Sequence, residues 1–341
     1  MKEALLYKKI DGRKINCRAC YQYCVVDNGQ RGICGIREND DGKLYSLVYG
    51  KVIALNIDPI EKKPLFHFLP GSETLSLATA GCNFKCLNCQ NADISQLTKN
   101  DRKTLRENLG KKISPEKIIE MALTNKTPSI SYTYTEPTIF VEYALDIMKL
   151  AHQKNIKNIW VTNGYFSPET FEIIRPYLDA ANVDLKFFSD KFYQQVCGAK
   201  LQPILDNLRL LKKNKIWFEI TTLLIPNYID QEKQLENITK FIKTKLDAET
   251  PWHISAFSPT YKMNDLSPTS FRLVEQAYQI GQNEGLKYVY TGNLSNIKSH
   301  EDTTCPNCGQ VNIKRSNYQI QRLDKNGFCH NCERSLDLIL K

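Results

Sequence analysis

The chain has 341 residues, of which 42% are hydrophobic and 24% are charged, and its formal net charge is +9 at pH 7. This length predicts a substantial core and two or three domains. Lys and Arg are scattered and lie within a few residues of Asp or Glu, which argues against nucleic-acid binding, since that function needs clustered positive potential.

No targeting or membrane segment is visible in the sequence. The first residues, "MKEALLYKKIDGRK", lack the apolar stretch of a signal peptide, and no window approaches the roughly 18 consecutive apolar residues of a membrane span. We therefore expect a cytoplasmic protein without membrane association. Thiols stay reduced in that compartment, so the twelve cysteines predict metal ligation and not disulfides.

The chain order predicts three parts: an N-terminal four-cysteine module over residues 1–70, a central domain over residues 71–298, and a C-terminal module over residues 299–341. Within the first part, residues 40–64 are interpreted as a hairpin. Its turn is Asp41 and Gly42, because an Asp-Gly pair suits a tight hairpin turn.

The central domain alternates short strand-like runs with longer helix-like runs. The strand-like runs are rich in β-branched and aromatic residues and end at Gly, Pro, Asn or Ser. Several helix-like runs follow a capping Ser and a Pro, as at Ser114 and Ser167. Repeated strand-helix units predict an α/β fold whose parallel sheet forms a full or partial TIM-type (β/α) barrel. The expected strands are residues 74–80, 129–134, 158–163, 182–188, 216–224, 251–257 and 287–293, and the expected helices are residues 115–124, 137–153, 168–179, 202–213, 231–245 and 269–284.

Two of these strands carry polar residues on one alternating face. Asp184 and Lys186 share a face of one strand, and His253 and Ser255 share a face of another. The apolar faces should pack under the helices, so the polar faces should point into the barrel. Buried charges are costly unless they are paired or bound to a ligand, and the barrel interior is therefore predicted to be a binding chamber.

The cysteines form three groups, and Cys197 stands apart as a buried or surface thiol without a metal. The C-terminal group consists of two C-x2-C pairs separated by twenty residues, a spacing typical of zinc ribbons. His330, inside the second pair, is interpreted as an exposed spacer. The groups are Cys17, Cys20, Cys24 and Cys34; Cys82, Cys86 and Cys89; and Cys305, Cys308, Cys329 and Cys332.

The N-terminal group has spacings of two, three and nine residues. These four cysteines are predicted to bind zinc or an auxiliary iron-sulfur cluster. So small a module needs a metal to hold it together, which favours zinc. Both alternatives remain open from the sequence.

The middle group lies in "GCNFKCLNCQN", residues 81–91, directly after the first expected barrel strand. Three thiolates on a tight loop could hold zinc with a distant fourth ligand, or an iron-sulfur cluster with one iron left open. A structural zinc site is usually closed by four ligands in paired C-x2-C knuckles, which this loop does not form. Its place at the C-terminal end of a strand, where such barrels carry their chemistry, favours the open cluster.

The C-x3-C-x2-C loop resembles the signature of the radical S-adenosylmethionine (SAM) enzymes. The resemblance implies that Cys82, Cys86 and Cys89 hold a 4Fe-4S cluster whose fourth iron binds SAM. The reduced cluster would cleave SAM to a 5'-deoxyadenosyl radical, which abstracts hydrogen from a substrate. An external low-potential electron donor is then expected as a partner.

The same resemblance supplies the predicted SAM contacts. Glu136 in "YTYTEPT" matches the second-strand motif that holds the SAM amino group, although an acidic residue is also favoured at a helix N-terminus. Asn163 in "TNGY" fits the ribose side, and Asp184 and Lys186 in "DLK" match the fourth-strand motif of glycyl-radical-enzyme activases. "LLIPNYID", residues 223–230, resembles the fifth-strand stretch of those activases. Asn88 stands where the superfamily usually has an aromatic residue that packs on adenine. His253 is interpreted either as a SAM or substrate contact or as a structural residue.

Together with the N-terminal cysteines, "DPIEKKPLFHFLPGS" and the C-terminal pairs, these motifs resemble the radical SAM protein of the AmmeMemoRadiSam system, within the pyruvate formate-lyase activating enzyme-like group. The resemblance implies hydrogen abstraction from a glycyl residue of a protein partner. Modification of a small molecule or of another protein site is the alternative reaction. The alternative of a different class is a zinc-containing interaction protein in which all three cysteine groups are structural.

Overall fold

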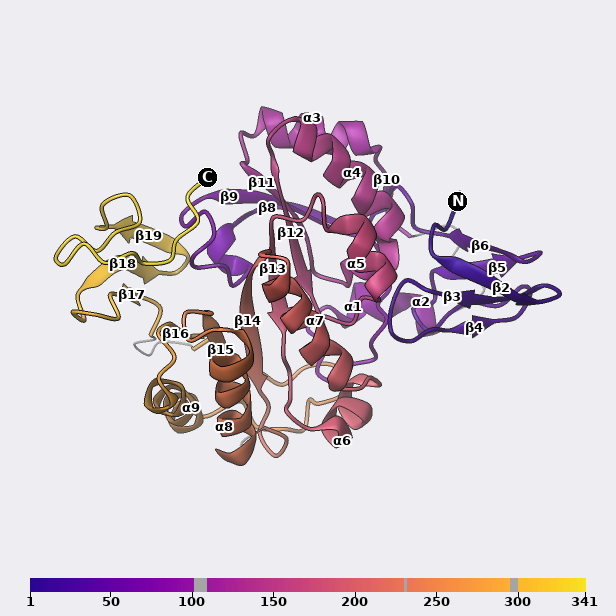
Figure 1. Ribbon diagram of the computed structural model, residues 1–341. Coiled ribbons are helices and arrows are strands. Elements are labelled where there is room, and N and C mark those ends of the chain that lie inside the picture. Colours follow the sequence, from indigo (N-terminus) through magenta and orange to yellow (C-terminus); the bar gives the residue numbers. More distant parts are fainter. Residues whose placement is uncertain (101–108, 230–231, 295–299) are drawn as a thin grey trace. The chain divides into compact units, whose positions relative to one another are not determined.

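The computed structural model describes residues 1–100, 109–229, 232–294 and 300–341, and the chain divides into two compact units (Figure 1). Unit 1 comprises Met1–Asp58, Glu73–Ala181 and Val196–Ala199. Unit 2 comprises Pro59–Ser72, Asn182–Gln195 and Lys200–Lys341. The boundaries expected at residues 70 and 298 remain predictions.

Unit 1 begins with two small antiparallel sheets that carry the first cysteine group. One has the strand order β2-β3-β4 and the other β1-β6-β5. Strands β5 and β6 form a hairpin at the predicted turn, with Asp40 paired to Lys43 and positive φ angles at Asp41 and Gly42. The hairpin covers Arg37–Ser46 and not residues 40–64, since β7 (Lys51–Val52) and β8 (Ala54–Pro59) belong to other sheets. The strands are β1 (Lys2–Glu3), β2 (Tyr7–Asp11), β3 (Lys14–Cys17), β4 (Val25–Val26), β5 (Arg37–Asp40) and β6 (Lys43–Ser46).

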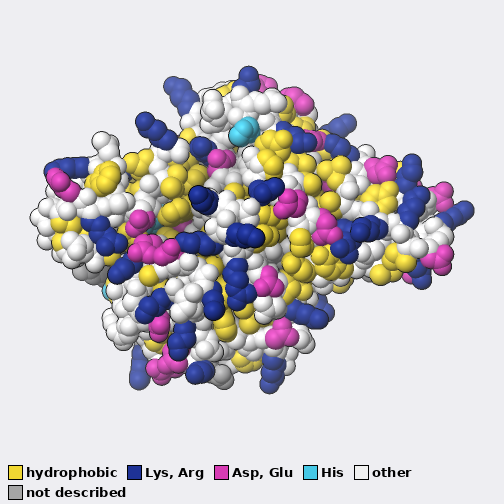
Figure 2. All heavy atoms as spheres, in the orientation of Figure 1, with side chains coloured by type: hydrophobic (Ala, Val, Ile, Leu, Met, Phe, Trp, Pro, Cys, Tyr) yellow, Lys and Arg dark blue, Asp and Glu magenta, His cyan; other side chains and the backbone are white. Residues whose placement is uncertain are grey.

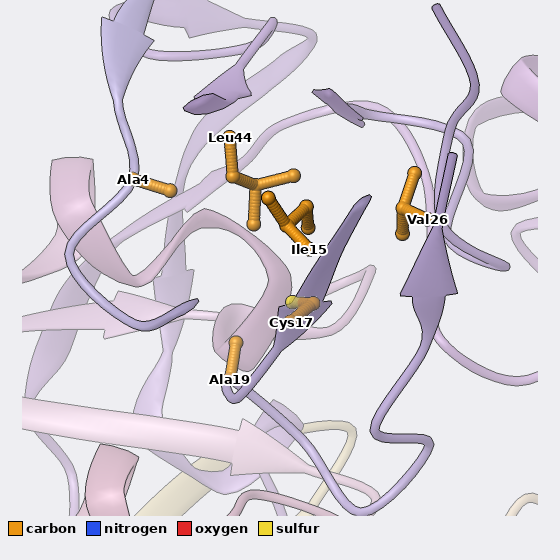
Figure 3. Packing of buried hydrophobic residues seen from close by; sticks show 6 residues of the cluster. All are labelled: Ala4, Ile15, Cys17, Ala19, Val26 and Leu44. Atoms are coloured by element: carbon orange, nitrogen blue, oxygen red, sulfur yellow. The ribbon is translucent and has the colours of Figure 1, made fainter. Parts of the chain in front are cut away.

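A small apolar cluster holds these strands together. It consists of six buried side chains, two of which are alanines and one of which is Cys17 (Figure 3). So little apolar surface contributes only a small part of what a stable fold needs, since burial yields about 25 cal/mol per Å². The six residues are Ala4, Ile15, Cys17, Ala19, Val26 and Leu44.

The strands of unit 1 run in the order β12-β11-β9-β8, in which β12, β11 and β9 are parallel. Ser129 of β11 pairs with Thr74 of β9 on one side and with Lys157 of β12 on the other. Helix α3 packs on α4, and α4 packs on β12 (Figure 1). The elements are β7 (Lys51–Val52), β8 (Ala54–Pro59), β9 (Glu73–Ala78), α1 (Ala92–Ser95), α2 (Leu97–Asn100), β10 (Lys111–Lys112), α3 (Pro115–Thr124), β11 (Ser129–Tyr132), the 3-10 helix η3 (Pro137–Phe140), α4 (Val141–Gln153), β12 (Lys157–Thr162) and α5 (Pro168–Ile174).

Unit 2 contains the parallel strands β14, β15 and β16, which pair in that order. Strand β13 (Ala180–Asp184) has its first two residues in unit 1 and its last three in unit 2. Helix α8 packs on α9, and α9 packs on β15 and β16. The elements are η1 (Ile60–Lys62), α6 (Asp190–Phe192), η4 (Tyr193–Cys197), α7 (Gln202–Lys213), β14 (Trp217–Leu224), α8 (Glu232–Phe241), η5 (Ile242–Leu246), β15 (Trp252–Ala256), α9 (Phe271–Glu284), β16 (Val289–Gly292), β17 (Thr303–Thr304), β18 (Val311–Ser316) and β19 (Gln319–Arg322).

The mostly parallel central sheet with flanking helices confirms the predicted α/β class, while closure into a barrel stays a prediction. The predicted caps are present, because Ser114 Oγ accepts from Lys117 N and Ser167 Oγ accepts from Thr170 N. Several predicted bounds differ from the structure by one or two residues, and two ends differ by more. Helix α5 ends at Ile174 and not at residue 179, since Pro176 has no backbone N–H with which to continue the helical hydrogen bonds.

The strand expected at residues 182–188 is β13, which ends at Asp184. The backbone N–H of Lys186 donates to the hydroxyl of Tyr193 at 2.9 Å, so it is not paired with a neighbouring strand. Residues 230 and 231, at the ends of "LLIPNYID" and of the expected helix 231–245, lie outside the described residues. Within that expected helix, α8 gives way to a π-helical turn, η5, after Phe241.

The surface carries both signs of charge. Lys and Arg side chains are interspersed with Asp and Glu on the face drawn in Figure 2, without a continuous basic stripe there. Among the described residues, no helix is both long enough and apolar enough to cross a bilayer.

Candidate functional site

The three-cysteine loop follows β9 in unit 1 and is held by backbone hydrogen bonds. Lys85 N donates to Cys197 O and Leu87 N to Val196 O, each at 3.0 Å. Cys82, Cys86 and Cys89 are all partly buried, so each keeps some contact with solvent.

Polar hydrogens lie next to two of the three sulfurs. Phe84 N donates to Cys82 Sγ at 3.4 Å, and the Ser95 hydroxyl lies 3.1 Å from Cys89 Sγ. Hydrogen bonds to cysteine sulfur are one of the means by which proteins tune iron-sulfur clusters. The donor set, three thiols on one loop with such neighbours, fits the predicted cluster.

Gly81, directly before Cys82, has a backbone conformation and a close contact that only glycine accommodates. Its φ is +99°, and a Cβ there would lie 2.9 Å from the carbonyl oxygen of Cys34. An L side chain would therefore be strained and would collide with backbone. The first and second cysteine groups thus approach each other closely at this glycine.

Glu136 is buried at the ends of β11 and β12. Its Oε1 accepts from Thr138 N at 3.1 Å, from the Thr138 hydroxyl at 2.6 Å and from the Thr162 hydroxyl at 2.8 Å. Its Oε2 accepts from Asn163 N at 2.8 Å. Burial raises the pKa of this carboxyl, while these hydrogen bonds oppose the rise. The helix-cap interpretation of Glu136 is confirmed by the contact with Thr138 N, and its contact with SAM stays a prediction.

Asn163 links Glu136 to the cysteine loop. Its Nδ2 donates to Asn83 Oδ1 at 2.8 Å, and its Oδ1 accepts from Tyr165 N at 3.0 Å. Asn83 is the residue after Cys82, and its Oδ1 lies 3.8 Å from the Cys82 sulfur. A chain of hydrogen bonds therefore runs from the buried carboxylate to Asn83, the residue after the first cysteine of the loop.

Two buried amide atoms of this loop lack a hydrogen-bond partner within the described structure: Asn83 Nδ2 and Asn88 Oδ1. An unpaired buried polar atom costs roughly 1–3 kcal/mol. Such atoms next to three thiols are therefore candidates for contact with a bound group. The Asn88 side chain is buried, and its predicted contact with SAM stays a prediction.

Asp184 and Lys186 lie in unit 2, where Lys186 Nζ contacts Asp184 Oδ2 at 2.7 Å. Both side chains are partly buried. Their predicted contact with SAM stays a prediction.

His253 belongs to a buried polar cluster in unit 2. Its Nε2 lies 2.6 Å from Glu219 Oε2, and Glu219 also accepts from the backbone N–H groups of Phe66 and His67. The interaction with His253 lowers the pKa of Glu219 against the opposing effect of burial. These contacts support the structural interpretation of His253.

The C-terminal cysteines form a compact group. The Sγ atoms of Cys305, Cys308, Cys329 and Cys332 all lie within 4.8 Å of one another, with 3.5 Å between Cys305 and Cys332 and 3.6 Å between Cys308 and Cys329. A tetrahedral zinc ion with Zn–S bonds of about 2.3 Å needs sulfurs about 3.8 Å apart. The predicted four-ligand arrangement is therefore present.

His330 is not the exposed spacer that was predicted. It is half-buried, and both its backbone N and its Nδ1 contact Asn312 Oδ1, at 2.9 and 3.0 Å. Asn312 Nδ2 in turn donates to Cys329 Sγ at 3.4 Å. His330 thus orients an amide that supports the cysteine group.

The N-terminal cysteines lie together around one small cavity, which Arg37 and Asn83 also line. The peptide after Cys20 runs beside the segment that follows β12, with Tyr21 N donating to Tyr165 O at 3.0 Å. Cys197 does not line this cavity; it is fully buried, and its backbone carbonyl accepts from Lys85 N of the three-cysteine loop.

Asn83, Thr162, Arg37 and Gln22 were not predicted as site residues. Gln22 Nε2 donates to the carbonyl oxygens of Asn83 and Gly198, each at 3.1 Å. Asn83 stands inside the cysteine motif, so its position was a usable signal. Thr162 begins the "TNGY" motif, so it had a similar signal, whereas the contacts of Arg37 and Gln22 join segments far apart in the sequence.

Comparison with known proteins agrees with this site. Residues 76–239, which include the cysteine loop, Glu136 and Asn163, match the Radical SAM superfamily. The protein MJ0808 of Methanocaldococcus jannaschii is 44% identical over 343 residues and is covered completely, as is this chain. MJ1632 of the same organism, which is named after the glycyl-radical enzyme activating enzymes, is 25% identical over 54% of this chain and 68% of that protein.

Among solved structures, a domain of pyruvate-formate lyase-activating enzyme from Bacteroides vulgatus superposes with a TM-score of 0.42 and 22% identity, covering 48% of this chain and 98% of that one. SuiB of Streptococcus suis bound to S-adenosylmethionine superposes with a TM-score of 0.49 and 16% identity, covering 69% of this chain and 53% of that one. Over its whole length the chain belongs to one family with MJ0808, and its residues 76–239 form a radical SAM domain.

Proposed function

We propose that the chain is a radical SAM enzyme in which Cys82, Cys86 and Cys89 hold a 4Fe-4S cluster and the open iron takes SAM. The observation that carries the proposal is the three-thiol loop, with donors to two of its sulfurs, inside a matched radical SAM domain. When bound, this cluster would supply the electron that cleaves SAM to a 5'-deoxyadenosyl radical, which abstracts hydrogen from the substrate. An external low-potential protein or chemical reductant would supply that electron.

The chain's own residues prepare the site. Glu136 fixes Asn163, and Asn163 fixes Asn83 next to Cys82, so the loop is positioned before any ligand binds. Asn88 Oδ1 is left to accept a hydrogen bond from SAM. Asp184 and Lys186, which contact each other through Lys186 Nζ and Asp184 Oδ2, are proposed as further SAM contacts because they match the activase motif. This division between positioning residues and contact residues is what the hydrogen bonds support.

We further propose that the substrate is a glycyl residue of a protein partner, so that the chain acts as an activating enzyme of the AmmeMemoRadiSam type. Support comes from the name of MJ1632 and from the 4-hydroxyphenylacetate decarboxylase activating enzyme of Clostridium scatologenes, which is 26% identical over 33% of this chain. Modification of a small molecule or of another protein site is the second candidate reaction.

The C-terminal cysteine group is proposed to bind one structural zinc ion. Its four sulfurs have the spacing of a tetrahedral site, and a site closed by four thiolates leaves no position for a substrate. It therefore contributes stability to β17–β19 and not chemistry. If all three cysteine groups bound only zinc, the chain would instead be an interaction protein.

The deciding experiment is anaerobic reconstitution with iron and sulfide, followed by dithionite and SAM. Release of 5'-deoxyadenosine is expected from the wild-type chain and from Cys197→Ala, a control that removes a buried cysteine outside the three groups. Cys86→Ala should release none while its zinc content is unchanged. Wild-type protein that holds a reducible cluster yet releases no 5'-deoxyadenosine would refute the proposal.

The substrate is tested on the same preparation. A glycyl radical on a co-purified protein, seen by electron paramagnetic resonance (EPR) after reaction, supports the activating role. Hydrogen transfer from a small molecule or from another protein position into 5'-deoxyadenosine would assign the second candidate reaction instead.

A further inference from the structure

The four N-terminal cysteines line one small cavity. Cys17, Cys20, Cys24 and Cys34 line this cavity together, although they come from separate segments between β3 and β5. Three of the four are buried and Cys24 is half-buried. Their thiols therefore share one protected space that the proposed reaction does not use.

The spacing of these thiols differs from that of the C-terminal group. Among the described residues, only the C-terminal cysteines bring three or more metal-ligating atoms within 4.8 Å of one another. A single zinc ion needs its sulfurs about 3.8 Å apart. An iron-sulfur cluster holds its thiolates farther apart, because iron and sulfide atoms lie between them.

A buried cation also lines the cavity. Arg37 is 2% exposed, and its Nη2 donates to Glu142 Oε2 at 2.6 Å while its Nε donates to Ile139 O at 3.0 Å. Its Nη1 has no hydrogen-bond partner within the described residues. A guanidinium donor held beside four thiols suits a group with net negative charge, since leaving such a donor unpaired is costly.

Backbone features around the cysteines fit the same ligand. Ile33 N donates to Cys24 Sγ at 3.5 Å, an N–H to sulfur contact of the kind found at iron-sulfur clusters. The Gly32 position also lies beside two of the sulfurs, since a Cβ there would be 3.5 Å from Cys24 Sγ and 4.0 Å from Cys34 Sγ.

We propose that Cys17, Cys20, Cys24 and Cys34 bind a second iron-sulfur cluster and not a single zinc ion. It would lie next to the three-cysteine loop, because Asn83 lines its cavity and also lies beside Cys82, and because Gly81 lies against the Cys34 carbonyl. Four protein thiolates leave this cluster without an open iron. Its place suits electron delivery to the loop and not SAM binding.

The test uses full-length protein in which the loop has lost its ligands through Cys82→Ala, Cys86→Ala and Cys89→Ala together. After anaerobic reconstitution, iron, sulfide and zinc are counted per chain, and EPR is recorded with dithionite before and after addition of SAM. We expect at least about two iron atoms with equal sulfide, about one zinc, and an EPR signal that SAM does not alter.

Adding Cys20→Ser and Cys34→Ser to that variant should remove the remaining iron and sulfide, whereas adding Cys197→Ala should not. A triple variant that holds about two zinc ions and no sulfide would overturn the proposal, and so would one that holds a single iron without sulfide or no iron at all. The triple variant lacks the loop cluster, so its result is independent of the proposed SAM chemistry. It also decides the question if the five-fold variant does not fold.

Discussion

The carboxylate of Glu136 accepts a hydrogen bond of 2.8 Å from the backbone N–H of Asn163, which joins the end of β11 to the end of β12 through one buried charge. The Asn163 side chain then donates to Asn83 beside Cys82. Glu136 therefore acts on the cysteine loop through Asn163 in the described structure. Its role as a positioning residue can be separated from a role in binding SAM.

Glu136→Gln should lower the free energy of unfolding by about 1–3 kcal/mol, because an amide NH₂ would then face the donors that the carboxylate now accepts. It should also slow 5'-deoxyadenosine release through misplacement of the loop. Urea denaturation and product release measure the two effects. Glu120→Gln, an exposed change on α3, is the matched control. Slower release with unchanged stability would assign Glu136 to SAM contact alone.

Arg37 and Glu142 form an ion pair that is nearly inaccessible to solvent. Arg37→Met should cost about 3–5 kcal/mol, because it leaves the Glu142 carboxylate buried without its cation. The double variant Arg37→Met/Glu142→Leu should cost at least about 1 kcal/mol less than the sum of the single variants. Chemical denaturation of the four proteins measures the coupling.

The exposed pair Lys117 and Glu120 on α3 provides the control for this cycle. Its coupling should stay within about 0.5 kcal/mol, as expected for a solvent-exposed pair. Additive effects of Arg37→Met and Glu142→Leu would contradict the buried-pair interpretation.

Local sequence signals predicted most elements of the fold. Helix α3 spans the predicted residues 115–124 because Ser114 and Pro115 define its start. The end of β13 was missed because it depends on the hydroxyl of Tyr193, which takes the Lys186 N–H. No periodicity in the strand itself reports such a contact.

The sequence also predicted part of the candidate site. Spacing alone identified the three cysteine groups, and the Pro after Glu136 indicated its capping role. The contacts of Glu136 with Thr162 and Asn163 depend on the register of β11 and β12, in which Tyr132 pairs with Trp160. That register is a property of the folded sheet. The difference in spacing between the outer cysteine groups likewise appears only in three dimensions.

Cys332→Ala should reduce bound zinc by about one ion per chain, because a structural zinc site needs all four thiolates. Leu336 packs on the buried Cys305 and Cys329, so loss of the ion should also loosen this small core. Hydrogen exchange in β17–β19 should rise while iron content stays at the wild-type value. Unchanged zinc in Cys332→Ala, relative to Cys197→Ala, would show that the ion is bound elsewhere.

Stability should depend on pH through His67, whose pKa is lowered to about 4 by burial in unit 2. Its Nδ1 lies 3.1 Å from Leu336 O and its Nε2 lies 2.6 Å from Tyr290 Oη, which fits a neutral ring that donates at Nδ1 and accepts at Nε2. The unfolded chain has a His pKa near 6.5 and binds the proton first as pH falls. His67 therefore contributes stability above pH 6.5, and this contribution is lost progressively toward pH 4, by about 3 kcal/mol in total.

Denaturation of the wild-type chain and of His67→Gln between pH 7.5 and pH 5 tests this, since Gln keeps one donor and one acceptor but does not titrate. The wild-type chain should lose stability more steeply than the variant as pH falls. Glu219 contacts the His67 backbone N–H and has a lowered pKa, so its own contribution is lost only below about pH 4.5, outside this window. Protonation of metal-binding thiolates affects both proteins equally. Equal slopes would therefore show that His67 does not carry the pH dependence.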